Sequence, residues 1–152
     1  MDLEQLAKRR TRIEDREAIK ELKARYCAIC DDEHNLDNIT TLFVEDGIWE
    51  GGDFGKAQGH AAICQLFQTF QRLISFSQHM ATNPIIEIEG TTAKSTWYFL
   101  GPLTFRKNTE AKWVAVRYED EYVKVNGKWK YTHLRAHLRL SAPYDTGRAK
   151  KD

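Results

Sequence analysis

The spacing of hydrophobic residues changes once along this chain, near residue 75. Before that point, apolar residues recur every three to four positions, which is typical of amphipathic helices. A helix is predicted over residues 11–30, because Thr11 and Glu14 have the spacing of a capping box. Four apolar residues share one face of this helix: Ile19, Leu22, Tyr26 and Ile29. A second, short helix is predicted over residues 36–44.

The next segment is predicted to alternate a strand, a loop and a helix. Residues 45–47 end the short helix and lead into a strand over residues 48–50. The glycine-rich stretch 51–59 is predicted to be a loop. The third helix, which follows it, is expected to bury four apolar residues: Ile63, Leu66, Phe67 and Phe70.

After residue 75 the hydrophobic period becomes two, which is typical of strands. Asn126-Gly127 is a strong hairpin signal between the last two predicted strands, and Pro84 places the first at a sheet edge or a bend. Helices followed by an antiparallel meander predict an α+β fold with the helices on one face of the sheet. The four predicted strands cover residues 77–90, 93–105, 112–125 and 128–140.

Alternation along the third of these strands predicts which side chains face the core. The more apolar face is expected to point inward, so Asp120 and the tyrosine hydroxyls on it must enter a pocket or find partners. Trp113 and Ala115 lie on the opposite face. The inward face carries Val114, Val116, Tyr118, Asp120 and Tyr122.

Composition narrows the class of protein. The 152 residues are 41% hydrophobic and 30% charged, with a net charge of +1, which is typical of one globular domain. This balance argues against binding to nucleic acid or to an anionic membrane, and the basic clusters 8–10 and 147–152 are interpreted as solvated ends. No apolar run reaches the roughly 20 residues of a membrane helix, and no secretion signal opens the chain, so we expect a cytoplasmic protein.

Cys27 and Cys30 form a C-x-x-C motif at the end of the first predicted helix. A structural zinc site needs four ligands, and the only other cysteine is Cys64. A redox pair would normally lie at a helix start, where the dipole lowers the thiol pKa. Both cysteines are therefore interpreted as packing residues, and we expect no metal and no cofactor.

Asp31 and Asp32 follow this motif, at the helix end that disfavours negative charge. One of them is expected to need a partner, and His79, at the start of a predicted strand, could supply it. His34 and His60 are assigned to loops. His133, Arg135, His137 and Arg139 alternate on one face of the last strand, which is either solvated or lines a polar cavity mouth.

Four stretches of the chain together resemble the SnoaL-like domain, within the nuclear-transport-factor-2-like superfamily. They are IEDREAIKELKARYC, LFVEDGIWEGGDFG, SQHMATNPIIEIEG with STWYFL, and RYEDEYVKVNGKWK, spanning roughly residues 10–142. The resemblance implies a cone, in which a curved mixed sheet wraps around the first helices and encloses one deep, apolar pocket. It implies one domain over residues 1–142, with an extension at 1–10 and a flexible basic tail at 143–152.

Three enzyme branches of this superfamily share a histidine–aspartate pair: scytalone dehydratases, bile-acid 7α-dehydratases and hexachlorocyclohexane dehydrochlorinases. Their positions match His79 and Asp31 here, although counting back through the loop selects Asp32 instead. The dehydratases' tyrosine matches Tyr26, and their arginine matches Arg139 when counted from the last-strand tryptophan. A further histidine of scytalone dehydratase has no counterpart, which argues against that substrate.

The resemblance therefore implies a cofactor-independent lyase acting on a small hydrophobic, aromatic or polycyclic, hydroxylated molecule. His79 would be the base, Asp31 its orienting acid, and Tyr26 with Tyr118 or Arg139 would bind the leaving oxygen. The further residues implied in substrate binding are Asp32, Trp49, Trp97, Phe99, Val116 and Asp120.

Three other functions stay open. The first is a non-catalytic binding protein, in which the His79 ring lies out of reach of Asp31. The second is a polyketide cyclase, for which Asp120 is the candidate acid, or an isomerase, although the acids of ketosteroid isomerase have no counterpart here. The third is an accessory subunit of a ring-hydroxylating dioxygenase. Relatives form trimers or dimers through the outer sheet face, so a homo-oligomer is expected, with Trp113 and Ala115 at the contact.

Overall fold

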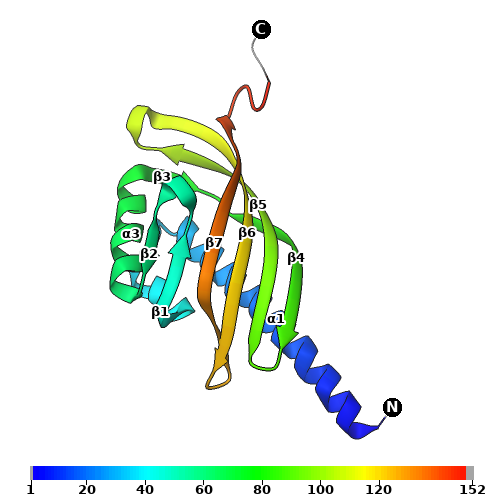
Figure 1. Ribbon diagram of the computed structural model, residues 1–152. Helices are drawn as coiled ribbons and strands as arrows, with labels where there is room; N and C mark the ends of the chain where they lie inside the picture. The colour runs from blue at the N-terminus through cyan, green and yellow to red at the C-terminus, as the bar shows by residue number, and fades with distance from the viewer. Residues whose placement is uncertain (1, 150–152) are drawn as a thin grey trace.

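The computed structural model describes residues 2–149, and its first helix is longer than predicted (Figure 1). Helix α1 spans Leu3–Asp31, and Asp2 caps it by accepting a hydrogen bond from the Gln5 amide at 2.7 Å. The predicted start at Thr11 is wrong. The first turns are fully solvated and held by ion pairs one turn apart, such as Lys8–Glu4 at 2.6 Å, so they need no core contact. Residues 3–10 of the expected extension are thus part of α1.

The segment after α1 contains more strand than the sequence pattern predicts. A short helix α2 (Leu36–Ile39) and a turn η1 (Thr40–Leu42) end where strand β1 (Phe43–Glu50) begins. The predicted loop contains a turn η2 (Gly52–Phe54) and strand β2 (Lys56–Gln58), which pairs antiparallel with β1. Helix α3 (His60–Leu73) confirms the third predicted helix, with Ile63, Phe67 and Phe70 buried and Leu66 half-buried.

The four predicted strands are confirmed as an antiparallel meander. They are β4 (Met80–Glu89), β5 (Thr92–Phe105), β6 (Glu110–Val125) and β7 (Lys128–Pro143), with a turn η3 (Lys107–Thr109) before β6. An additional short strand, β3 (Ile74–Ser77), pairs with β5. The sheet order is β2-β1-β7-β6-β5-β3, with β4 also paired to β5, and the parallel β1–β7 contact makes the sheet mixed.

Two local predictions about the strands are confirmed. Asn126 and Gly127 both have positive φ, 50° and 77°, as a two-residue hairpin between β6 and β7 requires. Strand β4 lies at an edge of the sheet, and its register shifts between Thr82 and Ile85, beside Pro84. The proline therefore interrupts pairing where it costs little.

The curved sheet packs one face against α1, and α3 covers the side near β1 and β2 (Figure 1). The predicted inward face of β6 is confirmed, because all five of its named residues are buried. Trp113 on the other face is half-buried, since the Tyr144 ring stacks on it at 5.0 Å between centroids. The chain past β7 is therefore packed at Tyr144, while residues 150–152 of the expected tail lie outside the described residues.

Within residues 2–149, no helix is long and apolar enough to cross a membrane.

Candidate active site

The last residue of α1 meets the turn between β3 and β4. Asp31 Oδ1 lies 2.6 Å from His79 Nδ1, and the same carboxylate accepts the His79 backbone amide at 2.8 Å through Oδ2. The Ser77 hydroxyl donates a third hydrogen bond to it at 3.1 Å. The structure therefore brings together His79 and Asp31. These donors also supply the compensation that a carboxylate at a helix C-terminus needs.

Charge and tautomer follow from these contacts. Burial alone would raise the pKa of Asp31, but hydrogen bonds from the His79 ring and amide lower that pKa below its usual value. An ionised carboxylate accepts hydrogen bonds only, so the His79 proton belongs on Nδ1. The lone pair of Nε2 is then free to accept a proton.

Two features outside the dyad position the His79 ring. The Phe99 ring stacks on it, with centroids 4.6 Å apart and an interplanar angle of 28°. Gly101 lets β5 approach the residue before His79, because a Cβ at this position would lie 1.9 Å from the Gln78 carbonyl oxygen. Sequence reasoning missed Gly101, although a glycine inside a strand is a known sign of close backbone approach.

His79 lines a cavity inside the cone. The cavity measures about 60 Å³ and lies between α1, α3 and the sheet. No Asp, Glu, Lys or Arg is among its lining residues, so a bound molecule meets only apolar, aromatic, hydroxyl, thiol and imidazole groups. Five predicted site residues besides His79 line it: Tyr26, Trp49, Phe99, Val116 and Tyr118.

The dyad also has an outer side. His79 and Asp31 both line an open groove of about 370 Å³, which contains residues of α1 and β4. Asp31 lines this groove only, whereas His79 lines both the groove and the cavity. Of the two residues, His79 is therefore the one that a molecule in the cavity contacts.

Tyr26 and Tyr118 contribute hydroxyl groups to the cavity. The Trp49 Nε1 donates a hydrogen bond to the Tyr26 hydroxyl oxygen at 2.8 Å. Burial raises the pKa of both tyrosines well above the usual value. They stay protonated at neutral pH and can donate hydrogen bonds to a ligand, but they cannot act as bases.

Two predicted substrate-binding residues lie outside the cavity wall. Asp120 is fully buried, and its Oδ2 accepts from Lys23 Nζ at 2.9 Å and from the Tyr122 hydroxyl at 3.2 Å. Trp97 is also buried, and its Nε1 donates to the Ser95 hydroxyl at 2.8 Å. Alternation correctly placed both inside the fold. Alternation could not show that Lys23 of α1 pairs with Asp120, or that Asp120 does not line the cavity.

Arg139 and Asp32 also require correction. Register shifts in the β6–β7 pairing leave Arg139 as an extra residue between Leu138 and Leu140, and its guanidinium lies 5.4 Å from the exposed Tyr98 ring centre. Counting from the last-strand tryptophan could not detect such a bulge. Asp32 is exposed and accepts from Asn35 Nδ2 at 2.8 Å. Neither residue lines the cavity.

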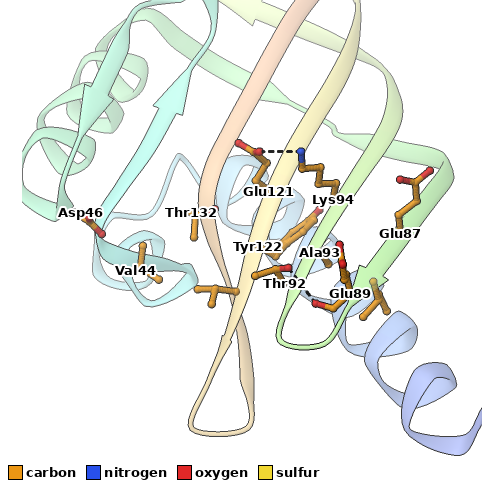
Figure 2. A pocket seen from close by; sticks show the side chains of 12 residues that line it. Val44, Asp46, Glu87, Glu89, Thr92, Ala93, Lys94, Glu121, Tyr122 and Thr132 are labelled. Carbon is orange, nitrogen blue, oxygen red and sulfur yellow. Dashed lines mark hydrogen bonds and ion pairs between the residues drawn. The ribbon is translucent and has the colours of Figure 1, made fainter. Parts of the chain in front are cut away.

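The other alternating residues of β7 form pairs with acids of the sheet rather than a polar cavity mouth. His133 lies 2.8 Å from Glu50, Arg135 lies 3.0 Å from Glu121, and neither lines the cavity. An open groove of about 840 Å³ crosses this outer face between β1 and β4 (Figure 2). It is far larger than the cavity, but charged residues such as Glu87, Lys94 and Glu121 are part of its wall, and it contains neither His79 nor Asp31.

One cavity residue was missed altogether. His34 was assigned to a loop, yet it is 4% exposed and its ring contacts Phe67, Phe70 and His79. Burial, and secondarily the nearby His79, lower the pKa of His34 to about 4. The His34 side chain points inward because the chain reverses direction after α1. The hydrophobic periodicity of the sequence does not predict such a reversal.

The two cysteines of the C-x-x-C motif are free and buried, so their interpretation as packing residues is confirmed. Burial raises the pKa of both thiols, which disfavours the reactive thiolate. Across residues 2–149, no three His, Cys, Asp or Glu side chains gather as a metal site would require.

Comparisons with known proteins agree with this architecture. A family model for the SnoaL-like domain matches residues 11–135. A proposed aromatic ring hydroxylase from Novosphingobium aromaticivorans is 28% identical, with a TM-score of 0.78 over 84% of this chain and 91% of that one.

Two more distant structures share the fold. A proposed scytalone dehydratase from the same organism is 22% identical, with a TM-score of 0.80 over 88% of this chain and 90% of that one. A hexachlorocyclohexane dehydrochlorinase, LinA-type3 from Novosphingobium barchaimii, is 18% identical, with a TM-score of 0.80 over 93% and 97%.

Proposed function

This chain belongs to the SnoaL-like domain family, and within that family we propose that it is a cofactor-independent lyase. The observation that carries the proposal is the 2.6 Å contact between His79 Nδ1 and Asp31 Oδ1 at the wall of an apolar cavity. A base held in one tautomer beside a water-poor cavity suits proton abstraction from carbon.

In the proposed elimination, His79 Nε2 takes a proton from a substrate carbon. The electron pair of the broken C–H bond forms a carbon–carbon double bond, and the bond to the leaving oxygen or halogen breaks. Asp31 keeps its hydrogen bond to Nδ1 and stabilises the imidazolium that forms. Tyr26 and Tyr118 line the same cavity, and their protonated hydroxyls would donate hydrogen bonds to the negative charge on the substrate.

The similar structures support elimination as the reaction class. Two of them are named for eliminations, a dehydrochlorinase and a proposed dehydratase. The non-catalytic alternative predicted a His79 ring out of reach of Asp31, and the observed contact argues against it. The cyclase alternative needed Asp120 in the cavity, whereas Asp120 is paired with Lys23.

Cavity size favours a single-ring substrate over a polycyclic one. An engineered protein cavity that binds benzene has roughly 150 Å³, whereas this cavity has about 60 Å³. A ring must therefore displace part of the wall. Phe54 is the wall residue best placed to move, since it is half-buried in a three-residue turn next to Gly55, whose φ is 112°.

The test is a turnover assay on neutral single-ring alcohols and halides, following new double bonds by absorbance and released halide by titration. His79→Ala is expected to reduce the rate by about 10²–10⁴-fold, because general-base catalysis contributes that much. Asp31→Asn should also lower the rate. Asp32→Asn is the matched control, since this adjacent carboxylate is exposed and accepts its hydrogen bond from Asn35 rather than from His79.

Wild-type turnover in both His79→Ala and Asp31→Asn would rule out the dyad. Self-association through the outer sheet face stays a prediction. Size-exclusion chromatography with light scattering tests it, and a protein that assembles only with a larger partner chain would favour the accessory-subunit alternative.

A further inference from the structure

His34 is a polar side chain in the cavity without a protein partner. Its backbone carbonyl accepts from Gln71, but neither ring nitrogen forms a hydrogen bond to another residue within the described residues 2–149. Among the described residues, the fully buried side-chain N and O atoms without a hydrogen bond are Asp120 Oδ1 and Tyr131 OH. The His34 nitrogens also lack a hydrogen bond but do not belong to this group, so they are accessible to some extent. His34 lines the cavity, so a molecule bound there contacts this residue.

The backbone at His34 is in an uncommon conformation. Glu33 and His34 have φ of 51° and 54°, two consecutive left-handed residues without a glycine. Residues in this region cost free energy and are found where the surrounding structure holds them in place. Here the turn carries the chain from α1 toward α2, and the His34 ring packs against Phe67 and Phe70, with centroids 5.7 and 5.5 Å away.

The position of His34 relative to the base is suited to a shared ligand. The centroids of the His34 and His79 rings lie 6.4 Å apart, on the wall of the same cavity. With a pKa of about 4, His34 is neutral at physiological pH and carries one N–H donor. A ligand acceptor atom in the cavity would give this N–H a hydrogen-bond partner.

We infer that His34 binds the leaving atom of the substrate, donating an N–H hydrogen bond to its oxygen or halogen opposite the base His79. This inference rests on the proposed elimination. His34 keeps its proton and only stabilises the charge that develops as the bond to the leaving atom breaks. A departing halide leaves as the anion, and a departing hydroxide takes up the proton that His79 removed, forming water.

The test measures binding, so it needs no knowledge of the true substrate. Phenol and toluene are matched single-ring probes, and only phenol carries an oxygen for His34. In His34→Phe, we expect the phenol dissociation constant to rise about 5–10-fold, as loss of one hydrogen bond implies. The toluene dissociation constant should stay within about twofold of wild type, since the ring contacts are kept.

A second variant guards against misfolding. His34→Asn accepts positive φ readily and keeps an amide donor, so it should retain part of the phenol affinity. Titration of ¹⁵N-histidine-labelled protein should shift the His34 ring signals with phenol and leave them nearly unchanged with toluene.

Equal phenol affinity in wild type and His34→Phe would overturn the inference, and so would failure of wild-type protein to bind phenol at all. The outcome is separable from the proposed function. If His79→Ala keeps full turnover while His34→Phe still loses phenol affinity, the ligand site stands and the elimination mechanism fails.

Discussion

Two acid–base contacts of helix α1, Lys23–Asp120 and Asp31–His79, differ in almost every physical respect. Lys23 and Asp120 are sealed, with side chains 1% and 0% exposed, whereas His79 and Asp31 are 9% and 27% exposed. The sealed pair leaves Asp120 Oδ1 without a partner. In the open pair, His79 Nδ1 bonds to Asp31, and the His79 ring also lines the cavity. The fully buried Lys23–Asp120 pair is therefore suited to a structural role, whereas the partly exposed His79–Asp31 pair is suited to catalysis.

Breaking the sealed pair should have the largest effect on stability. Lys23→Met leaves the Asp120 charge buried without its cation, which typically costs about 3–5 kcal/mol. It also removes an ammonium 3.3 Å from the centre of the Tyr118 ring. Urea unfolding measures the loss.

The double variant Lys23→Met/Asp120→Leu is the control. Replacing a whole buried ion pair with apolar residues is often neutral or stabilising. The double variant should therefore recover most of the stability. Equal losses in the single and double variants would show that the pair, rather than the uncompensated charge, provides the stability.

Gly101→Ala should have an intermediate effect on stability, and it should disturb the His79–Asp31 pair. The added methyl would collide with the Gln78 carbonyl, so the chain before His79 must move, at about 1–3 kcal/mol for overpacking. Because the dyad distance changes as well, turnover should fall further than stability implies. Chemical-shift mapping of the His79 ring together with thermal unfolding checks both parts.

Gly90→Ala, in the turn between β4 and β5, gives a matched control. Nothing lies within 4 Å of its added methyl, but its φ of 58° penalises alanine by roughly 1–2 kcal/mol. It should lower stability without moving His79. An unchanged His79 ring in Gly101→Ala would contradict the role assigned to Gly101.

The smallest effect is on the pH dependence of stability, where the two acids should act in opposite directions. The pKa of Asp31 is lower in the folded state, because hydrogen bonds from His79 outweigh burial. Its contribution is therefore present above the unfolded pKa, about 4, and is lost as pH falls through the folded pKa. Asp31→Asn should weaken the loss of stability in acid.

Asp120 has the reverse sign. Burial raises its pKa in the folded state, in spite of Lys23, so its contribution is present below the unfolded pKa and is lost as pH rises through the folded pKa. Asp120→Asn should remove that decline, which urea unfolding between about pH 3 and 7 can detect. Parallel changes in the two variants would contradict the contrast between the pairs.

The parts of this fold that follow from local chemistry were predictable. Alternation identified the four-strand meander, and Asn126-Gly127 and Pro84 marked a hairpin and an edge interruption, because each depends on neighbouring residues only. The start of α1 was missed because solvated ion pairs extend a helix without an apolar pattern.

The candidate site was only partly predictable. The family resemblance selected His79 and left Asp31 and Asp32 as alternatives, because one residue of loop length separates them. Arg139 was misplaced by a bulge, and His34 was missed because its direction depends on two left-handed residues. In each case, tertiary contacts set the direction of the side chain, and a local sequence pattern cannot predict it.

We propose that Asp31 holds His79 in the tautomer whose Nε2 accepts a proton. The direct measurement is the ¹⁵N spectrum of the His79 ring at neutral pH, in wild type and in Asp31→Asn. The wild-type ring should show a protonated Nδ1 and an unprotonated Nε2, and Asp31→Asn should abolish that preference. A proton on Nε2 in wild type, or an identical spectrum in the variant, would contradict the claim.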